Sequence, residues 1–307
     1  MKIQLQAPRD EGAAWHKALV AALPGATIAA WPDTLPEPDY ALVWKPPPEL
    51  FVRVRPARAI FNLGAGVEVL LAMPSLPAGI PIVRLEDAGM AVQMAEYVTL
   101  AVLSAYRETA AYAAQQREGR WQPRPRIAKT EFGVGILGFG VLGQAVAAAL
   151  ERFDFPLSAW STTRKDVSGV RSFAGQAELF AFLQSARVLV CFLPSTRETR
   201  DLLDRATLSR LPRGAWLVNV ARGPIVVDED LIALLDEGHL AGATLDVFRE
   251  EPLPPGHPFW HHPRITLTPH TSAVTQVEDS IAQVVSKIRR LERGEPVTGV
   301  VDRARGY

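Results

Sequence analysis

The sequence predicts an α/β protein made of two parallel-sheet domains, with one domain inserted into the other. Short apolar strands alternate with helical stretches along most of the 307 residues. A glycine-rich turn between a strand and a helix lies in mid-chain, at 138–143. Because such a turn follows the first strand of its domain, a separate unit must fold from the residues before it.

The first domain is expected to comprise residues 1–93 and 276–307. Short apolar runs alternate there with proline-rich turns. They predict strands at 2–5, 40–44, 59–63 and 81–83 and helices at 15–23 and 67–71. A last helix, opened by a capping box of Thr275 and Glu278 and closed by Gly294, carries an apolar stripe. We expect this helix to return to the first domain.

A helical pattern runs from Gly89 to Glu118, with apolar residues at helical spacing. Its apolar stripe is wider than one contact face needs. We interpret it as the connector between the domains and as a face for a homodimer, through residues 94–121. The alternative is a plain core helix.

Residues 94–275 are expected to form the second domain. Strands are predicted at 157–161, 186–193, 215–220, 243–247 and 265–267, and helices at 144–152, 178–184, 205–210 and 228–238. This regular alternation indicates a doubly wound parallel sheet.

The run at 132–143 is an apolar strand that leads into Gly138-x-Gly140-x-x-Gly143 and then into an alanine-rich helix. The first glycine permits a tight turn, the second lets the backbone approach a pyrophosphate, and the third lets the helix pack on the strand. Free amides at the helix N-terminus attract the anion. The pattern predicts a dinucleotide site in a Rossmann-like domain, with contacts from Gly138, Gly140, Val141, Leu142 and Gly143.

The end of the second strand of this domain indicates which dinucleotide binds. It reads Ser161-Thr162-Thr163-Arg164-Lys165, without the carboxylate that pairs with the ribose hydroxyls in NAD sites. Arg164 could hold a 2′-phosphate bidentately, and the hydroxyls could donate to it. We therefore expect NADPH/NADP+. In the alternative interpretation, the two cations belong to a solvated turn.

Composition excludes several classes of partner. There are 33 basic and 33 acidic residues, so nothing calls for nucleic acid or an anionic membrane. One cysteine, Cys191, lies in an apolar run, which fits a reducing cytoplasm. The N-terminal residues suggest a strand rather than a signal peptide. We expect no metal, since the adjacent His261 and His262 lack the spacing of a zinc pair.

Three residues that follow later strands suggest the chemistry. Arg222, Glu251 and His270 stand at or just after predicted carboxyl ends of parallel strands, where open α/β sheets bind ligands. Taken singly, each has a plainer explanation, as a turn residue, a solvated acid or a structural histidine. Their joint occurrence in this order favours a catalytic set.

With these motifs in hand, the whole chain resembles the D-2-hydroxyacid dehydrogenase family, and within it the glyoxylate/hydroxypyruvate reductase A group. The matching segments are Leu-Gly-Ala-Gly-Val (63–67), Gly-Phe-Gly-Val-Leu-Gly (138–143), Leu-Pro-Ser-Thr (193–196), Asn-Val-Ala-Arg-Gly (219–223), Asp-Val-Phe-Arg-Glu-Glu-Pro-Leu (246–253) and Thr-Pro-His-Thr (268–271). The resemblance implies a flavodoxin-like substrate domain around the inserted dinucleotide domain.

The resemblance also implies roles for single residues. Arg222 should hold the substrate carboxylate and α-oxygen, His270 should act as acid and base, and Glu251 should orient the imidazole. Asp246 should receive the nicotinamide carboxamide. The other expected cofactor contacts are Leu193, Pro194, Val220 and Ala221. The other expected substrate contacts are Trp44, Gly66, Val67 and Met94, and Trp121 is expected to reach a partner subunit's pocket.

The resulting hypothesis is NADPH-dependent reduction of small 2-oxo acids, namely glyoxylate to glycolate and hydroxypyruvate to D-glycerate. An alternative is a binding protein of the same fold that senses NADP(H) without turnover. It is disfavoured because a sensor needs no acid/base pair. A methyltransferase is a third possibility, which the basic strand end at 164–165 fits poorly.

Overall fold

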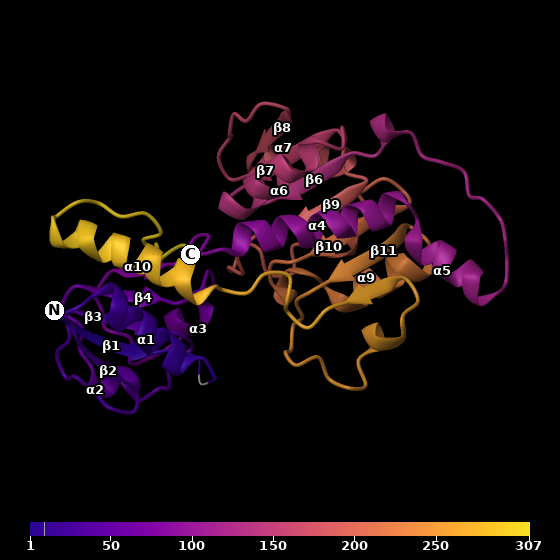
Figure 1. Cartoon of the computed structure of the whole chain (residues 1–307). Coiled ribbons are helices and arrows are strands. Elements are labelled where there is room, and N and C mark those ends of the chain that lie inside the picture. Colours follow the sequence, from indigo (N-terminus) through magenta and orange to yellow (C-terminus); the bar gives the residue numbers. More distant parts are fainter. Residues whose placement is uncertain (9) are drawn as a thin grey trace. The chain divides into compact units, whose positions relative to one another are not determined.

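Two parallel β-sheets organise the chain, one in each of two units (Figure 1). The structure is a computed structural model that describes residues 1–8 and 10–307. Unit 1 comprises Met1–Met90 and Val274–Tyr307, and unit 2 comprises Ala91–Ala273. Of the helices in the described residues, none has both the length and the apolar character needed to cross a bilayer.

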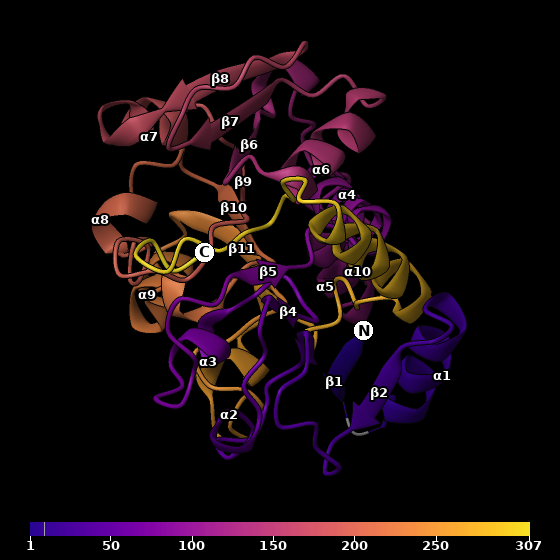
Figure 2. The same ribbon diagram turned by 90° about the vertical axis from the view of Figure 1, so that its left-hand side faces the viewer.

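Unit 1 contains a five-stranded sheet in the order β2-β1-β3-β4-β5, and all pairings are parallel. This is the flavodoxin-like order. Its strands are β1 (Lys2–Gln6), β2 (Thr27–Ala30), β3 (Tyr40–Val43), β4 (Ala59–Asn62) and β5 (Ile82–Arg84). Its helices are α1 (Gly12–Ala22), α2 (Leu50–Arg53), α3 (Glu68–Leu71) and α10 (Val277–Glu292). Helix α10 packs beside α1 (Figure 2), so the C-terminal helix does return to the first unit as expected.

Unit 2 contains a seven-stranded parallel sheet in the order β12-β11-β10-β9-β6-β7-β8, part of which is visible in Figure 2. The strands are β6 (Val134–Leu137), β7 (Leu157–Ser161), β8 (Val170–Ala174), β9 (Val188–Cys191), β10 (Ala215–Asn219), β11 (Leu240–Leu245) and β12 (Ile265–Leu267). The helices are α4 (Met90–Tyr106), α5 (Thr109–Arg117), α6 (Val141–Glu151), α7 (Gly175–Gln184), α8 (Arg205–Leu208) and α9 (Asp228–Asp236), with short 3-10 turns at Lys129–Glu131, Gly223–Ile225 and Pro258–His261. Strands β7 and β8 are added on one side of β6, and β9 to β12 are added on its other side. This reversal of strand order next to β6 makes the sheet doubly wound, as predicted.

Both faces of the larger sheet are covered. Val188 and Val190 belong to the core that includes α4 and α6, whereas Leu189 and Cys191 belong to the core that includes α7, α8 and α9. Successive residues of a strand point to opposite faces, so a sheet covered on both sides needs continuously apolar strands. Charged side chains of this sheet therefore gather near the strand ends.

The single helix expected from Gly89 to Glu118 is wrong. Helix α4 ends at Tyr106, and α5 starts at Thr109. Between them Glu108 adopts a left-handed conformation with φ of 54°, and its carboxylate pairs with Arg124. The apolar stripe of α4 packs Val98 and Val102 into the core of unit 2, so its breadth largely reflects burial.

Other local expectations also fail. Thr275 does not cap α10: the N-cap is Gln276, without a side-chain bond, and the Thr275 hydroxyl instead lies 3.9 Å from the sulfur of Met90. The amide of Gln276 donates to Ala88 O, which fixes the chain before the helix. Strands β2 and β8 were missed because their sequence signal is weak: β2 has one large apolar residue, Ile28, among its four, and β8 has Arg171 and Ser172 within its five.

Candidate active site

Three neighbouring strands bring the proposed catalytic residues to one edge of the larger sheet. Arg222 follows β10, Glu251 follows β11 and His270 follows β12, and β10, β11 and β12 are adjacent in the sheet. All three strands are parallel, so their carboxyl ends share this edge.

Glu251 and His270 are in direct contact. The Nδ1 atom of His270 lies 2.8 Å from Oε2 of Glu251, and the amide of Phe248 donates to Oε1 of Glu251 at 3.0 Å. The two side chains are 37% and 47% exposed, so the pair remains open to a ligand. Because Nδ1 faces the carboxylate, Nε2 is the nitrogen left to exchange a proton with a substrate.

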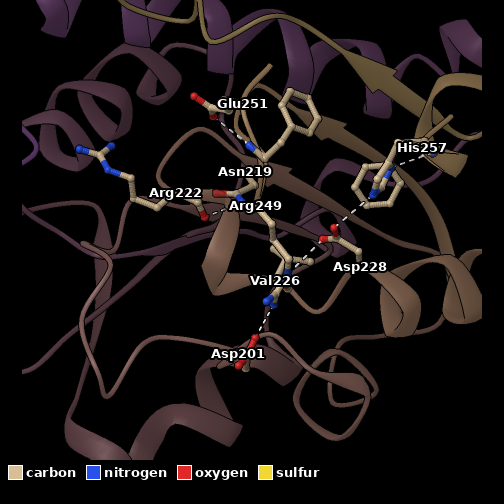
Figure 3. A network of polar contacts seen from close by, with 10 residues as sticks. Asp201, Asn219, Arg222, Val226, Asp228, Arg249, Glu251 and His257 are labelled. Atoms are coloured by element: carbon tan, nitrogen blue, oxygen red, sulfur yellow. Dashed lines mark hydrogen bonds and ion pairs between the residues drawn. The ribbon is translucent and has the colours of Figure 1, made fainter. Parts of the chain in front are cut away.

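The turn that carries Arg222 is shaped by a buried asparagine. Asn219 donates from Nδ2 to Arg222 O and accepts from the amide of Ala221. The next residue, Gly223, packs so closely on the chain at Phe248 that a Cβ atom there would lie 1.8 Å from the Phe248 carbonyl carbon. This contact brings the Arg222 turn against the loop that bears Glu251 (Figure 3).

An ion-pair network holds the same loop from the other side. Arg249 donates to Val226 O and pairs with Asp201, and its Nε lies 3.6 Å from Asp228, which also contacts His257 at 3.4 Å. Burial raises the pKa of Asp228, while Arg249 and His257 act in the opposite direction. Figure 3 shows the guanidinium of Arg222 extending away from this network. Arg249 therefore fixes the loop, whereas the side chain of Arg222 points away from the ion-pair network.

The glycine turn has the geometry expected of a phosphate-binding loop. Gly138 has φ of 101°, and a Cβ there would lie 2.8 Å from the carbonyl carbon of Phe192. A Cβ on Gly143 would lie 2.6 Å from Gly138 O, whereas a Cβ on Gly140 would meet no atom within 4 Å. Gly140 is the N-cap of α6 and offers no side chain to it, so the first amides of α6, at Val141 and Leu142, are available to an anion.

The basic end of β7 is engaged within the protein. The Nη2 atom of Arg164 donates to both carboxylate oxygens of Glu178 on α7, at 2.5 and 2.7 Å, and its Nη1 atom donates to Ser172 O. This pairing contributes to lowering the pKa of Glu178, after the larger effect of the Ala174 amide. Lys165 donates to Phe139 O within the glycine turn at 2.6 Å, and Ser161 donates to Thr163 O. Lys165 thus lies beside the glycine turn and Arg164 lies beside β8. Thr162 and Thr163, next to them in sequence, are exposed.

The remaining expected cofactor positions lie at the ends of other strands. Leu193 and Pro194 follow β9, where Thr199 donates to Pro194 O. Val220 and Ala221 follow β10 and are buried. Asp246 is fully buried after β11, and its carboxylate accepts three hydrogen bonds from residues near His270. Its expected contact with a carboxamide stays a prediction.

The expected substrate positions fall into both units. In unit 1, the ring of Trp44 packs against Gly64, Gly66 O accepts from Asn62, and Val67 is buried before α3. In unit 2, Met94 is 5% exposed and belongs to the core around α4. These four assignments stay predictions.

Sequence reasoning missed several residues of this site. Asn219, Glu178, Tyr97 and Thr268 all form hydrogen bonds that shape it. Asn219 had a usable signal, because an asparagine at a strand end commonly bonds the following turn. The others depend on contacts between residues 14 to 171 positions apart, which no local pattern reveals.

Comparison with known proteins shows the family and the fold. Residues 99–272 match the model of the D-isomer specific 2-hydroxyacid dehydrogenase, NAD binding domain, family. A D-isomer specific 2-hydroxyacid dehydrogenase from Xanthobacter autotrophicus Py2, solved with NADPH and MES, is 42% identical, with a TM-score of 0.95 over 100% of this chain and 99% of that one.

Two further solved structures cover 100% of this chain and 99% of their own. An NADPH-dependent glyoxylate/hydroxypyruvate reductase from Sinorhizobium meliloti, in complex with NADP and sulfate, is 34% identical with a TM-score of 0.92. A probable 2-hydroxyacid dehydrogenase from Rhizobium etli CFN 42, in complex with NADP, HEPES and L(+)-tartaric acid, is 34% identical with a TM-score of 0.90.

The fold and these similarities define a two-domain α/β dehydrogenase. The chain belongs to the D-2-hydroxyacid dehydrogenase family, which confirms the family suggested by its motifs.

The glycine turn yields a paired prediction. Gly143→Ala should lower the melting temperature, because its Cβ would collide with Gly138 O and push α6 off β6. Gly140→Ala should fold normally, since its Cβ meets open space, but should bind a dinucleotide at least about ten-fold more weakly by obstructing the pyrophosphate. Thermal melts and fluorescence titration with NADPH measure the two effects. Equal melting temperatures for the two variants would contradict the packing role of Gly143.

Proposed function

We propose that this protein reduces small 2-oxo acids with NADPH, glyoxylate to glycolate and hydroxypyruvate to D-glycerate first among them. The contact between His270 and Glu251, beside the Arg222 turn, is the observation that carries the proposal. His270 supplies an acid/base group and Arg222 supplies a cation, both at the carboxyl edge of a sheet of the kind that binds dinucleotides. The similarity to the Sinorhizobium meliloti reductase supports the choice of substrates.

The residues present fit the coenzyme. Gly140 leaves open space where a side chain would stand, and the uncapped start of α6 offers amides to a pyrophosphate. Gly138, Val141, Leu142 and Gly143 complete this turn. NADPH supplies the hydride when bound. Ser161 to Lys165 would surround its 2′-phosphate, and Leu193, Pro194, Val220, Ala221 and Asp246 would line the remainder.

The protein's own contribution is binding, orientation and a proton. The planar guanidinium of Arg222 holds the substrate carboxylate and α-oxygen. Nε2 of His270 donates a proton to the oxygen as it gains negative charge, and Glu251 holds the ring through Nδ1. The proposal includes Gly66 and Val67 as amide donors to the carboxylate, and Trp44 and Met94 as walls.

The proposal also places the protein in a reducing compartment, the cytoplasm. Cys191 is fully buried in β9, and burial raises the pKa of its thiol to about 12. As the one cysteine of the sequence, Cys191 cannot form an internal disulfide, which fits the cytoplasm.

Activity should depend on the histidine and its partner. The wild type should oxidise NADPH with glyoxylate and hydroxypyruvate. His270→Gln should lower kcat by roughly 10²–10⁴-fold, the usual contribution of a general acid. Glu251→Gln should also lower kcat, while both variants bind NADPH as the wild type does in fluorescence titration.

Matched controls come from the connection between β11 and β12, which also carries Glu251. Glu250→Gln removes the neighbouring exposed acid and His261→Gln an exposed histidine, and both should keep full activity. Pyruvate, phenylpyruvate and NADH complete the panel. Tight NADPH binding without turnover of any 2-oxo acid would refute the reductase and favour the sensing protein.

Coenzyme choice should depend on Arg164. Arg164→Gln should weaken NADPH binding roughly ten-fold or more and leave NADH binding unchanged, because hydrogen bonds to charged groups are strong. Glu178→Gln should tighten NADPH binding by up to about five-fold, since an exposed carboxylate no longer competes for the guanidinium. Fluorescence titrations with both coenzymes test this. An equal loss of NADPH and NADH affinity in Arg164→Gln would contradict it.

We propose a homodimer through residues 94–121. The exposed apolar side chains in this region support it: Trp121 is 98%, Leu100 66% and Tyr112 41% exposed. Isolated large apolar residues are normal on a surface, but Trp121 stands almost fully in solvent. Sedimentation equilibrium should give about twice the chain mass of 33.5 kDa, and Trp121→Glu should weaken the association. A monomer at all concentrations would disprove the dimer.

A further inference from the structure

A buried carboxylate lies behind His270. Asp246 directly follows β11 and is 0% exposed. Its Oδ1 accepts from the hydroxyl of Thr268 at 2.6 Å and the amide of Thr271 at 2.8 Å, and its Oδ2 accepts from the amide of Ser272 at 2.9 Å. A buried anion needs such donors to offset its lost hydration. The donors come from both sides of His270, so the turn that carries the histidine is wrapped around this carboxylate.

A tyrosine from α4 extends the network by one step. The hydroxyl of Tyr97 lies 2.5 Å from Oγ1 of Thr268. A threonine hydroxyl has one proton, and Thr268 gives it to Asp246, since an ionised carboxylate only accepts. Tyr97 must therefore be the donor. Burial raises the pKa of Tyr97, the hydrogen bond with Thr268 acts in the opposite direction, and the charge of Asp246 raises it further. The net shift is upward, so the phenol keeps the proton it donates.

The turn itself needs support. His270 has φ of 54°, a conformation that side-chain-bearing residues rarely adopt, and its amide donates to Asp246 O at 2.9 Å and to Thr268 O at 3.0 Å. A backbone conformation of this kind is strained and is kept only where contacts with neighbouring groups stabilise it. Any shift of the turn moves the imidazole relative to Glu251, 2.8 Å away. Small displacements of a catalytic group strongly reduce rate.

We propose that Tyr97 and Thr268 are positioning residues for His270, acting in the order Tyr97 to Thr268 to Asp246. The hydroxyl chain fixes the side chain of Asp246, and the carboxylate holds the Thr271 and Ser272 amides that set the direction of the imidazole. This inference rests on the proposed role of His270. It assigns a function to α4 beyond packing, because Tyr97 lies on the same helix as the core residue Val98.

Four variants test the series of hydrogen bonds from Tyr97 through Thr268 to Asp246. Tyr97→Phe and Thr268→Val each remove one hydroxyl and keep the shape, and each should lower kcat roughly ten-fold, with KM and NADPH affinity within about two-fold of the wild type. Thr268→Ser keeps the hydroxyl and should restore kcat. The double variant Tyr97→Phe/Thr268→Val should be no slower than Thr268→Val, because both changes break one chain. Tyr106→Phe, on the same helix in an aromatic cluster, is the matched control and should behave as the wild type.

Hydrogen exchange by mass spectrometry gives a readout that needs no substrate. The peptide containing Thr271 and Ser272 should exchange faster in Tyr97→Phe and Thr268→Val and at the wild-type rate in Thr268→Ser and Tyr106→Phe. Wild-type kcat in Thr268→Val, additive losses in the double variant, or unchanged exchange would each overturn the proposal. Should the wild type reduce no 2-oxo acid, the proposed function fails, and the exchange rates alone decide whether the hydroxyl chain holds the turn.

Discussion

Burial of both faces of the seven-stranded parallel sheet is the constraint on which the site depends. Helices on both faces leave apolar positions along the strands and move polar chemistry to the strand ends. Parallel direction then collects the ends of β10, β11 and β12 at one edge. Arg222, Glu251 and His270 lie 19 to 48 positions apart in sequence, yet they follow neighbouring strands. The same constraint explains why Asp246, one residue past β11, is a buried anion that must be satisfied by its neighbours.

Close backbone packing converts that edge into a defined site. Gly223 lets the Arg222 turn lie directly on the chain at Phe248, and the amide of Phe248 in turn holds Glu251. On the outer side, Arg249 ties the loop to Asp201 and Asp228. The loop is therefore fixed by groups that do not face a ligand. This arrangement leaves the imidazole and its carboxylate partner half exposed but well oriented.

The sequence was most informative where the signal was local. The glycine turn at 138–143, the apolar strands of the larger sheet and the strand ends carrying the three catalytic candidates could all be predicted from short motifs. Prediction failed where distant residues compete with a local pattern. The break at Glu108 involves Arg124, and the start of α10 is fixed by Ala88. Strands β2 and β8 gave a weak signal because β2 has one large apolar residue among its four and β8 mixes polar and apolar residues.

The sequence by itself determined the fold class, the position of the dinucleotide turn and the types of residue available for acid/base work, because periodicity, glycine and motif order act within a few residues. Only the tertiary structure decided which nitrogen of His270 meets Glu251, that Arg164 already has an anionic partner, and that Tyr97 and Thr268 reach the carboxylate behind the histidine. Hydrogen bonds depend on distances of about 3 Å and on direction. Such geometry between residues far apart in the chain is set only when the sheet and its helices pack together.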